Sequence, residues 1–254
     1  MGADAPLSCD AFLGGRLRLW QPKNGYRAGV DPVLLAASVP ARPGQTVLDV
    51  GCGIGTAMFC LGARVPGLEL TGLEIQPEYA ALAERNAVEN AVPAQVLVGD
   101  VTAMPTALRQ RRFDHVITNP PYYIAHRATA PDNAGRGVAL AETVPLGGWL
   151  EHACRRLAPR GILTVIQRAD RLADVMAVMP STLGAIIVQP LAPRDGRDAA
   201  LVVIQAQKGA KAPMRLAAPI VMHRHARHRA GEKDYSNEIE AVLREGAALP
   251  ISKG

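Results

Sequence analysis

A glycine-rich run begins with a carboxylate, at Asp49-Val-Gly51-Cys-Gly53-Ile-Gly55. Glycine lets the backbone turn sharply and approach a ligand closely. A helix that begins beside such a turn points its unpaired N–H groups at that ligand. The spacing is G-x-G-x-G, whereas the dinucleotide fingerprint of dehydrogenases is G-x-G-x-x-G, and residue 56 is Thr. Glycine loops also form ordinary tight turns, so the surrounding residues decide the interpretation.

Two acids follow this loop where later strands are expected to end. Glu74 closes the β-rich segment 69–73, and Asp100 follows the segment 94–98. A carboxylate at the second strand end can accept both hydroxyls of a ribose, and one at the third can accept from an adenine amino group. We therefore predict a cofactor site that contains Asp49, Gly51, Gly53, Gly55, Glu74, Ile75, Asp100 and Val101.

A second cluster, Asn119-Pro120-Pro121-Tyr122-Tyr123, follows the apolar segment 113–118. This motif resembles the N-P-P-Y motif of class I S-adenosylmethionine-dependent methyltransferases, and the resemblance implies that the methyl acceptor is a nitrogen conjugated to a π-system. Such an exocyclic amine is a poor nucleophile because its lone pair is delocalised into the ring. The side-chain oxygen of Asn119 and the backbone carbonyl of Pro120 can accept its two N–H groups and stabilise the developing positive charge. The Pro-Pro pair stiffens that carbonyl, and Tyr122 offers a face for stacking. We predict Asn119, Pro120, Pro121 and Tyr122 as catalytic, Asn119 also as cofactor-binding, and Tyr122 and Tyr123 as substrate-binding; a plain Pro-Pro turn is the alternative.

Strands and helices alternate from residue 46 onward. Periodicity predicts strands at 46–50, 69–73, 94–98, 113–118 and 162–167, and helices at 56–65, 77–90, 146–157 and 171–179. Two late strands, 185–189 and 199–206, have no helix between them, so they should form an antiparallel hairpin at the sheet edge. The predicted fold is α/β: a doubly wound, Rossmann-like sheet of seven mostly parallel strands with an antiparallel C-terminal hairpin.

The glycine loop, the two acids and the N-P-P-Y motif together resemble class I S-adenosylmethionine-dependent methyltransferases. The resemblance spans residues 25–207, and it implies S-adenosyl-L-methionine as cofactor and a nitrogen conjugated to a π-system as methyl acceptor. Three shorter segments are similar to the bacterial tRNA1(Val) adenine-37 N6-methyltransferases. These segments are 27–36, the Pro-Pro-Tyr-Tyr variant with its polar loop to residue 142, and Tyr235-Ser236.

Residues 1–45 precede the alternation and are predicted to form a collar or lid over the methyltransferase core at 46–207. In the resembled family the segment 24–31 covers the methionine end of the cofactor, which implies cofactor contacts for Arg27 and Gly29. A surface ion pair is the alternative for Arg27. Asp31 is expected to cap a helix at 32–37 whose first residue is proline.

Residues 208–254 are predicted to be a basic C-terminal extension packed on the core. The net charge of +5 permits a polyanionic partner, and positive charge is dense at 208–233. We predict that Arg224, Arg227 and Arg229 contact RNA phosphates. A solvated charged loop is one alternative, and a metal site in the H-x-H-x-x-H run is another. Neither a carboxylate nor a cysteine lies beside those histidines, so we predict no metal.

Composition narrows the class of protein further. Apolar residues make up 48% and charged residues 20%, which permits a real core and excludes a disordered chain. No apolar run reaches the ~18–20 residues of a membrane span, and the N-terminus lacks the pattern of a secretory signal. Four irregularly spaced cysteines do not indicate a disulfide framework. We therefore expect a cytoplasmic protein with reduced thiols and no membrane partner.

The resemblance implies that the protein methylates N6 of an adenine in RNA, in the anticodon region of tRNA. A glutamine N5-methyltransferase of release factors is an alternative, although in the resembled family it carries a larger N-terminal helical domain. An rRNA guanine N2- or DNA adenine methyltransferase is another alternative. The glycine spacing and the lack of an obvious Tyr-x-x-x-Lys argue against a nicotinamide-dependent dehydrogenase.

Overall fold

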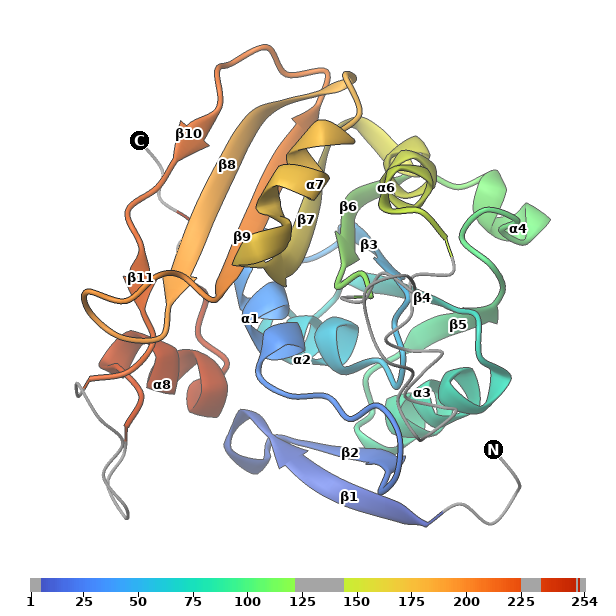
Figure 1. Ribbon diagram of the computed structural model, residues 1–254. Coiled ribbons are helices and arrows are strands. Elements are labelled where there is room, and N and C mark those ends of the chain that lie inside the picture. The colour runs from blue at the N-terminus through green and yellow to red at the C-terminus, as the bar shows by residue number, and fades with distance from the viewer. Residues whose placement is uncertain (1–5, 122–143, 225–233, 250, 252–254) are drawn as a thin grey trace.

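The computed structural model describes residues 6–121, 144–224, 234–249 and 251. The described chain contains a nine-stranded sheet in the order β10-β8-β9-β7-β6-β3-β4-β5, with β11 also pairing with β8 (Figure 1). Strands β3 to β7 run parallel, and β9 is antiparallel to both β7 and β8. The strands are β3 (Thr46–Val50), β4 (Glu69–Glu74), β5 (Ala94–Val98), β6 (Phe113–Thr118), β7 (Leu157–Arg168), β8 (Leu183–Ala192), β9 (Leu201–Lys208), β10 (Arg215–Leu216) and β11 (Ile220–Val221).

Helices cover both faces of the sheet, and neighbouring residues of a strand point into different cores. Val47 belongs to the core beneath α1, α2, α3 and α8, whereas Leu48 belongs to the core beneath α4, α6 and α7. Burial on both faces explains why consecutive apolar residues of a central strand, such as Val47 and Leu48 of β3, are both fully buried. The helices are α1 (Asp31–Ser38), α2 (Thr56–Arg64), α3 (Pro77–Glu89), α4 (Thr106–Arg109), α6 (Leu146–Arg155), α7 (Leu172–Ala177) and α8 (Asn237–Glu245).

The predicted Rossmann-like fold is confirmed, with three local corrections. The predicted helix 146–157 ends at Arg155, and β7 begins at Leu157 rather than at 162, because a shift in register after Phe113 accommodates Pro159. The antiparallel pair is not the outermost part of the sheet, since β10 and β11 lie beyond β8. Asp31 does not precede α1 as a cap but is its first residue, where a carboxylate favours the helix dipole.

The N-terminal residues form a hairpin of β1 (Leu7–Phe12) and β2 (Leu17–Pro22) that lies beside α3 (Figure 1). The Asn86 side chain accepts from the backbone N–H of Trp20 at 2.7 Å and donates to the carbonyl of Trp20 at 3.1 Å. Asn90 makes the same two contacts with Arg18, at 2.7 and 2.8 Å. Two asparagines one helical turn apart therefore fasten the hairpin to α3.

The C-terminal helix α8 joins the hairpin side of the molecule to α1. Ser236 caps this helix by accepting from the N–H of Ile239, and Arg16 donates to the carbonyl of Glu245 at 2.6 Å. Leu249 donates its N–H to the carbonyl of Ala37 at 2.8 Å. None of the helices in the described ranges has the length and apolar character needed to cross a bilayer, and all four cysteines are unpaired.

Candidate active site

The glycine loop joins the end of β3 to the start of α2. Gly51, Gly53 and Gly55 have φ angles of 72°, 56° and 86°, in the left-handed region that favours glycine. A Cβ on Gly55 would lie 2.2 Å from the ring of Phe59. The N–H of Gly51 donates to the carbonyl of Leu73 at 2.8 Å, so the loop is held against the end of β4.

Glu74, the last residue of β4, fastens the loop with its carboxylate. One oxygen accepts from the N–H of Gly53 and the other from the N–H of Gln76, each at 2.9 Å. The side chain is buried, and burial raises the pKa of Glu74 above its usual value. Each carboxylate oxygen retains a second lone pair for a ligand in the adjoining cavity.

A cavity of about 460 Å³ opens at the carboxyl ends of β3, β4 and β6, within the size range of small-molecule sites. Most of the residues predicted from the sequence lie on its wall: Asp49, Gly51, Gly53, Glu74, Ile75, Asp100, Val101, Asn119, Pro120 and Pro121. Gly55 immediately precedes α2 and is not one of the residues that line the cavity. Arg27 and Gly29 are not on the wall, although Tyr26 and Ala28 are.

Asp49, in β3, lines this cavity with an incomplete set of hydrogen-bond partners. It accepts a hydrogen bond from the backbone of Met58, while its Oδ2 is buried without a partner among the described residues. Burial, with a smaller contribution from the charge of Glu74, raises the pKa of Asp49 to about 7. A cationic group bound in the cavity would therefore stabilise the ionised carboxylate.

Replacing Asp49 by asparagine is expected to change how stability depends on pH. The unfolded chain ionises Asp49 near pH 3.8, but the folded chain does so near 7, so wild-type stability falls as pH rises between these values. The free energy of unfolding of Asp49→Asn minus that of the wild type should therefore be larger at pH 8 than at pH 4, by up to about 4 kcal/mol. Urea unfolding without ligand at both pH values measures this difference.

The same experiment contains its own control. Burial lowers the pKa of His115 to about 4, so His115 also titrates in this range, with the opposite sign. Because His115 is present in both chains, its contribution cancels in the difference between them. A difference in unfolding free energy that is independent of pH would contradict the raised pKa of Asp49.

Asn119 follows β6, lines the cavity and carries an acceptor without a partner. Its Oδ1 is buried and has no hydrogen-bond partner among the residues that the structure describes. The preceding hydroxyl, of Thr118, donates to the carbonyl of Val50 at 2.8 Å and accepts from Nε1 of Trp149 at 3.0 Å. Buried acceptors are normally paired, so this oxygen has an unused capacity to accept a hydrogen bond.

Three aromatic residues of the wall were not predicted from the sequence. Trp149 lies on α6, and its ring comes within 2.9 Å of the position that a Cβ on Gly51 would occupy. Tyr79 accepts the N–H of Tyr26 on its hydroxyl at 3.1 Å, and burial raises the pKa of Tyr26 to about 12. Tyr26 stands inside the N-terminal segment already singled out, whereas Tyr79 and Trp149 have no local sequence signal.

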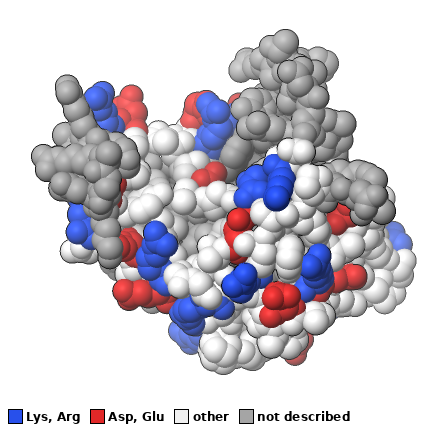
Figure 2. Space-filling model, turned by 90° about the horizontal axis from the view of Figure 1, so that it is seen from below, with Lys and Arg blue, Asp and Glu red and all other residues white. Residues whose placement is uncertain are grey.

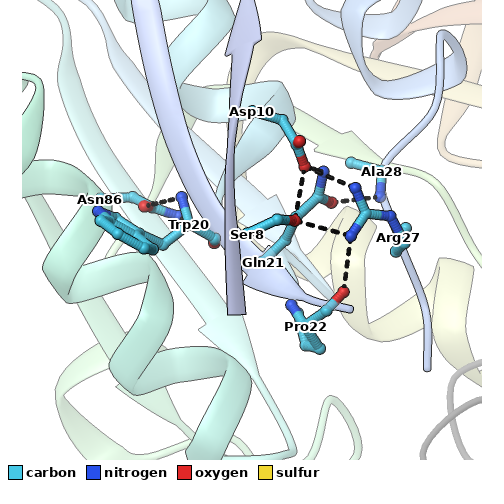
Figure 3. Close-up of polar contacts among 8 residues, drawn as sticks. All are labelled: Ser8, Asp10, Trp20, Gln21, Pro22, Arg27, Ala28 and Asn86. Atoms are coloured by element: carbon cyan, nitrogen blue, oxygen red, sulfur yellow. Dashed lines mark hydrogen bonds and ion pairs between the residues drawn. The ribbon is translucent and has the colours of Figure 1, made fainter. Parts of the chain in front are cut away.

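Arg27 takes part in a polar network under the hairpin (Figure 3). Its guanidinium pairs with Asp10 at 2.6 Å and donates to the hydroxyl of Ser8 at 2.8 Å and the carbonyl of Pro22 at 3.0 Å. Gln21 also donates to Asp10 and accepts the N–H of Ala28 at 3.0 Å. The ion pair that was the alternative role of Arg27 is thus observed. These contacts fix Arg27 between Tyr26 and Ala28, which both line the cavity.

The basic extension is only partly described. Arg224 pairs with Glu240 at 2.9 Å, and His223 contacts Asp234 at 3.1 Å and stacks on Tyr235. Across the described ranges, no group of three or more His, Cys, Asp or Glu side chains is placed to hold a metal ion. The predicted site residues Tyr122, Tyr123, Arg227 and Arg229 lie outside the described residues.

Comparisons with known proteins show the family of this chain. The model of the methyltransferase small domain matches residues 28–186. A protein of Porphyromonas gingivalis strain W83, named tRNA1(Val) (adenine(37)-N6)-methyltransferase, is 32% identical over 181 residues, which cover 66% of this chain and 69% of that protein. A crystal structure of a predicted O-methyltransferase from Agrobacterium tumefaciens superposes with a TM-score of 0.68 at 28% identity, covering 86% of this chain and 98% of that one.

A further solved structure agrees in fold. The 16S rRNA N2 G1207 methyltransferase of Thermus thermophilus, in complex with AdoMet and guanosine, has a TM-score of 0.56 at 21% identity and covers 80% of this chain and 50% of that one. The cavity suits S-adenosyl-L-methionine, because Asp49 has an unpaired buried oxygen for a cation and Glu74 and Asp100 stand at the two neighbouring strand ends. The chain belongs to the methyltransferase small domain family and is an S-adenosyl-L-methionine-dependent methyltransferase.

Proposed function

We propose that this methyltransferase acts on N6 of an adenine in the anticodon region of tRNA. The observation that carries the proposal is the buried, unpartnered Oδ1 of Asn119 on the wall of the cavity, beside the glycine loop. An amine that carries two N–H groups supplies the donor that this oxygen lacks. The names of the relatives described above support tRNA as the substrate.

The carboxylates of the wall would hold the cofactor. In this proposal Glu74 would accept the ribose hydroxyls, Asp100 would accept from the adenine amino group, and Asp49 would face a positively charged part of the molecule. When bound, the cofactor supplies an electrophilic methyl group. Arg27 and Gly29 are proposed to act on the cofactor by holding the segment that covers it, and Gly55 by shaping the loop.

Asn119 and Pro120 would orient the amine. Two acceptors around the nitrogen hold its lone pair toward the methyl group, which is catalysis by proximity and orientation. The same acceptors stabilise the positive charge that develops on nitrogen during transfer. The proton then leaves a strongly acidic ammonium-like centre, so the chain does not need a strong general base. Tyr122 and Tyr123 remain proposed as the surface on which the base stacks.

The three predicted parts of the chain would divide this work. Residues 1–45 are proposed as the collar that bounds the cofactor cavity, and residues 46–207 as the catalytic core. Residues 208–254 are proposed as an extension whose Arg224, Arg227 and Arg229 contact RNA phosphates. The described member of that set, Arg224, is engaged by Glu240 and would have to leave it to bind phosphate.

Transfer of labelled methyl groups to total tRNA, rRNA and a release factor tests the proposal. We expect label in tRNA that nucleoside analysis identifies as N6-methyladenosine. Label in rRNA as N2-methylguanosine, label in the release factor, or methyl groups on oxygen would contradict it. An Asn119→Ala protein purified in parallel controls for a contaminating enzyme.

A further inference from the structure

A cluster of cationic side chains lies at the end of the sheet opposite the cavity, around the first residues of β6 and β7. Its members come from the end of α4 and the turn after it, from the end of α6, and from the end of β9. We call Arg109, Arg111, Arg112, Arg155, Arg156 and Lys208 the amino-edge cluster. They are far apart in sequence, and only the register of the sheet brings them together.

Main-chain carbonyls hold these cations close to one another. The carbonyl of Arg109 accepts from both Arg112, at 3.3 Å, and Arg156. Lys208 donates to the carbonyl of Cys154 at 3.3 Å and to that of Leu157 at 2.8 Å. Carbonyls at a helix C-terminus stabilise cations through the helix dipole, but they carry no formal charge that would neutralise the cluster.

Carboxylates compensate little of this charge. Residues 106–114 and 151–160 contain six arginines and only two acids. Glu151 pairs with Arg155 at 2.5 Å, and Asp114 accepts from the N–H and hydroxyl of Thr46. Burial, and after it the charges of Arg112 and two other arginines, lowers the pKa of Arg156, as expected where like charges are gathered.

Two arginines elsewhere in the molecule, Arg194 and Arg224, are each paired with a carboxylate. Arg194 pairs with Asp234 at 2.9 Å, and Arg224 pairs with Glu240 at the same distance. Figure 2 views the molecule from the side of the hairpin and α8, and basic and acidic side chains alternate across that face. The amino-edge cluster is on the opposite side, where the starts of β6 and β7 lie in Figure 1.

We propose that the amino-edge cluster binds the phosphodiester backbone of the RNA substrate at a point remote from the methylated base. This inference rests on the proposed function. Guanidinium groups match phosphate oxygens with paired hydrogen bonds, and such contacts set the position of an RNA without reading its sequence. The six residues of β6 span about 20 Å, so a folded RNA that places one base in the cavity can reach the cluster with another segment.

The test variant replaces three exposed members of the cluster, as Arg109→Gln, Arg112→Gln and Arg155→Gln together. The matched control removes the same charge from exposed arginines elsewhere, as Arg18→Gln, Arg197→Gln and Arg244→Gln. Titration of labelled tRNA at several salt concentrations measures Kd and its salt dependence. The slope of log K against log salt is negative, and its magnitude should decrease by about 2 to 3 in the test variant. Binding of tRNA should weaken roughly tenfold or more at low salt.

Two further measurements separate the possible outcomes. Binding of S-adenosylhomocysteine by calorimetry should be the same in all three proteins, which shows that the test variant is folded. The KM for tRNA should rise with little change in kcat, as expected when uniform binding is lost. A Kd and salt slope equal to those of the control would overturn the role of the cluster. Absence of methyl transfer to tRNA by the unaltered chain would instead contradict the proposed function.

Discussion

Replacing Asn119 by alanine should lower kcat roughly 100- to 1,000-fold and leave cofactor affinity nearly unchanged. The side-chain oxygen is a buried acceptor without a partner, and its proposed partner is an amine whose charge grows in the transition state. Loss of one preorganised electrostatic contact of this kind typically costs that much in rate. Single-turnover methyl transfer measures the chemical step, and calorimetry with S-adenosylhomocysteine measures the affinity.

Two variants make this result specific. Asn119→Asp keeps an acceptor oxygen at the same position and should retain more activity than Asn119→Ala. Thr118→Val removes the hydroxyl that joins Val50 to Trp149 and should reduce kcat less, because it changes only the position of Asn119. An Asn119→Ala protein with full activity would rule out the proposed catalytic role of this side chain.

Replacing Glu74 by alanine should weaken S-adenosylhomocysteine binding about 100-fold. The carboxylate accepts from the N–H groups of Gly53 and Gln76, so its loss releases the loop and leaves two partly buried donors without this partner. Hydrogen bonds to a charged group contribute about 1.5 to 3 kcal/mol each, and the proposed ribose contacts are lost as well. Calorimetric titration of both proteins gives the ratio of their dissociation constants.

Glu74→Gln is the matched control for this prediction. Glutamine keeps the length of the side chain and one acceptor oxygen, but its NH2 group replaces the second oxygen. The glutamine side chain therefore cannot accept from both N–H groups in the way that the carboxylate does. Its affinity should therefore lie between those of the wild type and Glu74→Ala. Equal affinity in all three proteins would mean that Glu74 does not contribute to the cofactor site, whatever its effect on the loop.

The accuracy of the predicted strand bounds differs from one strand to the next. Strands β3, β5 and β6 have the predicted bounds, because a short apolar run between turn residues is a local signal. The start of β7 was predicted wrongly, because proline argues against a strand and the register shift that accommodates Pro159 is a property of the pair β6–β7. The extra strands β10 and β11 are two residues long, too short for periodicity to indicate.

Some of the residues that line the cavity were predicted from the sequence, and others were not. The glycine loop, Glu74, Asp100 and Asn119 were found because each lies at a strand end, and the carboxyl ends of parallel strands meet at one edge of the sheet. Trp149 and Tyr79 were missed because they reach the cavity from helices whose orientation depends on packing. Arg27 was assigned to the cofactor, and its contact with Asp10 depends on a hairpin that the sequence did not reveal.

Residue type and local spacing were enough to predict the family, the fold and the residues that stand at the strand ends beside the cavity. The location of uncompensated positive charge could be read only from the folded chain. Arg224, expected to be available for RNA, is paired with Glu240, whereas Arg112, Arg156 and Lys208 gather at the amino edge from three separate segments. The field of a cation depends on distances in space, and those distances follow from strand order and register rather than from position along the chain.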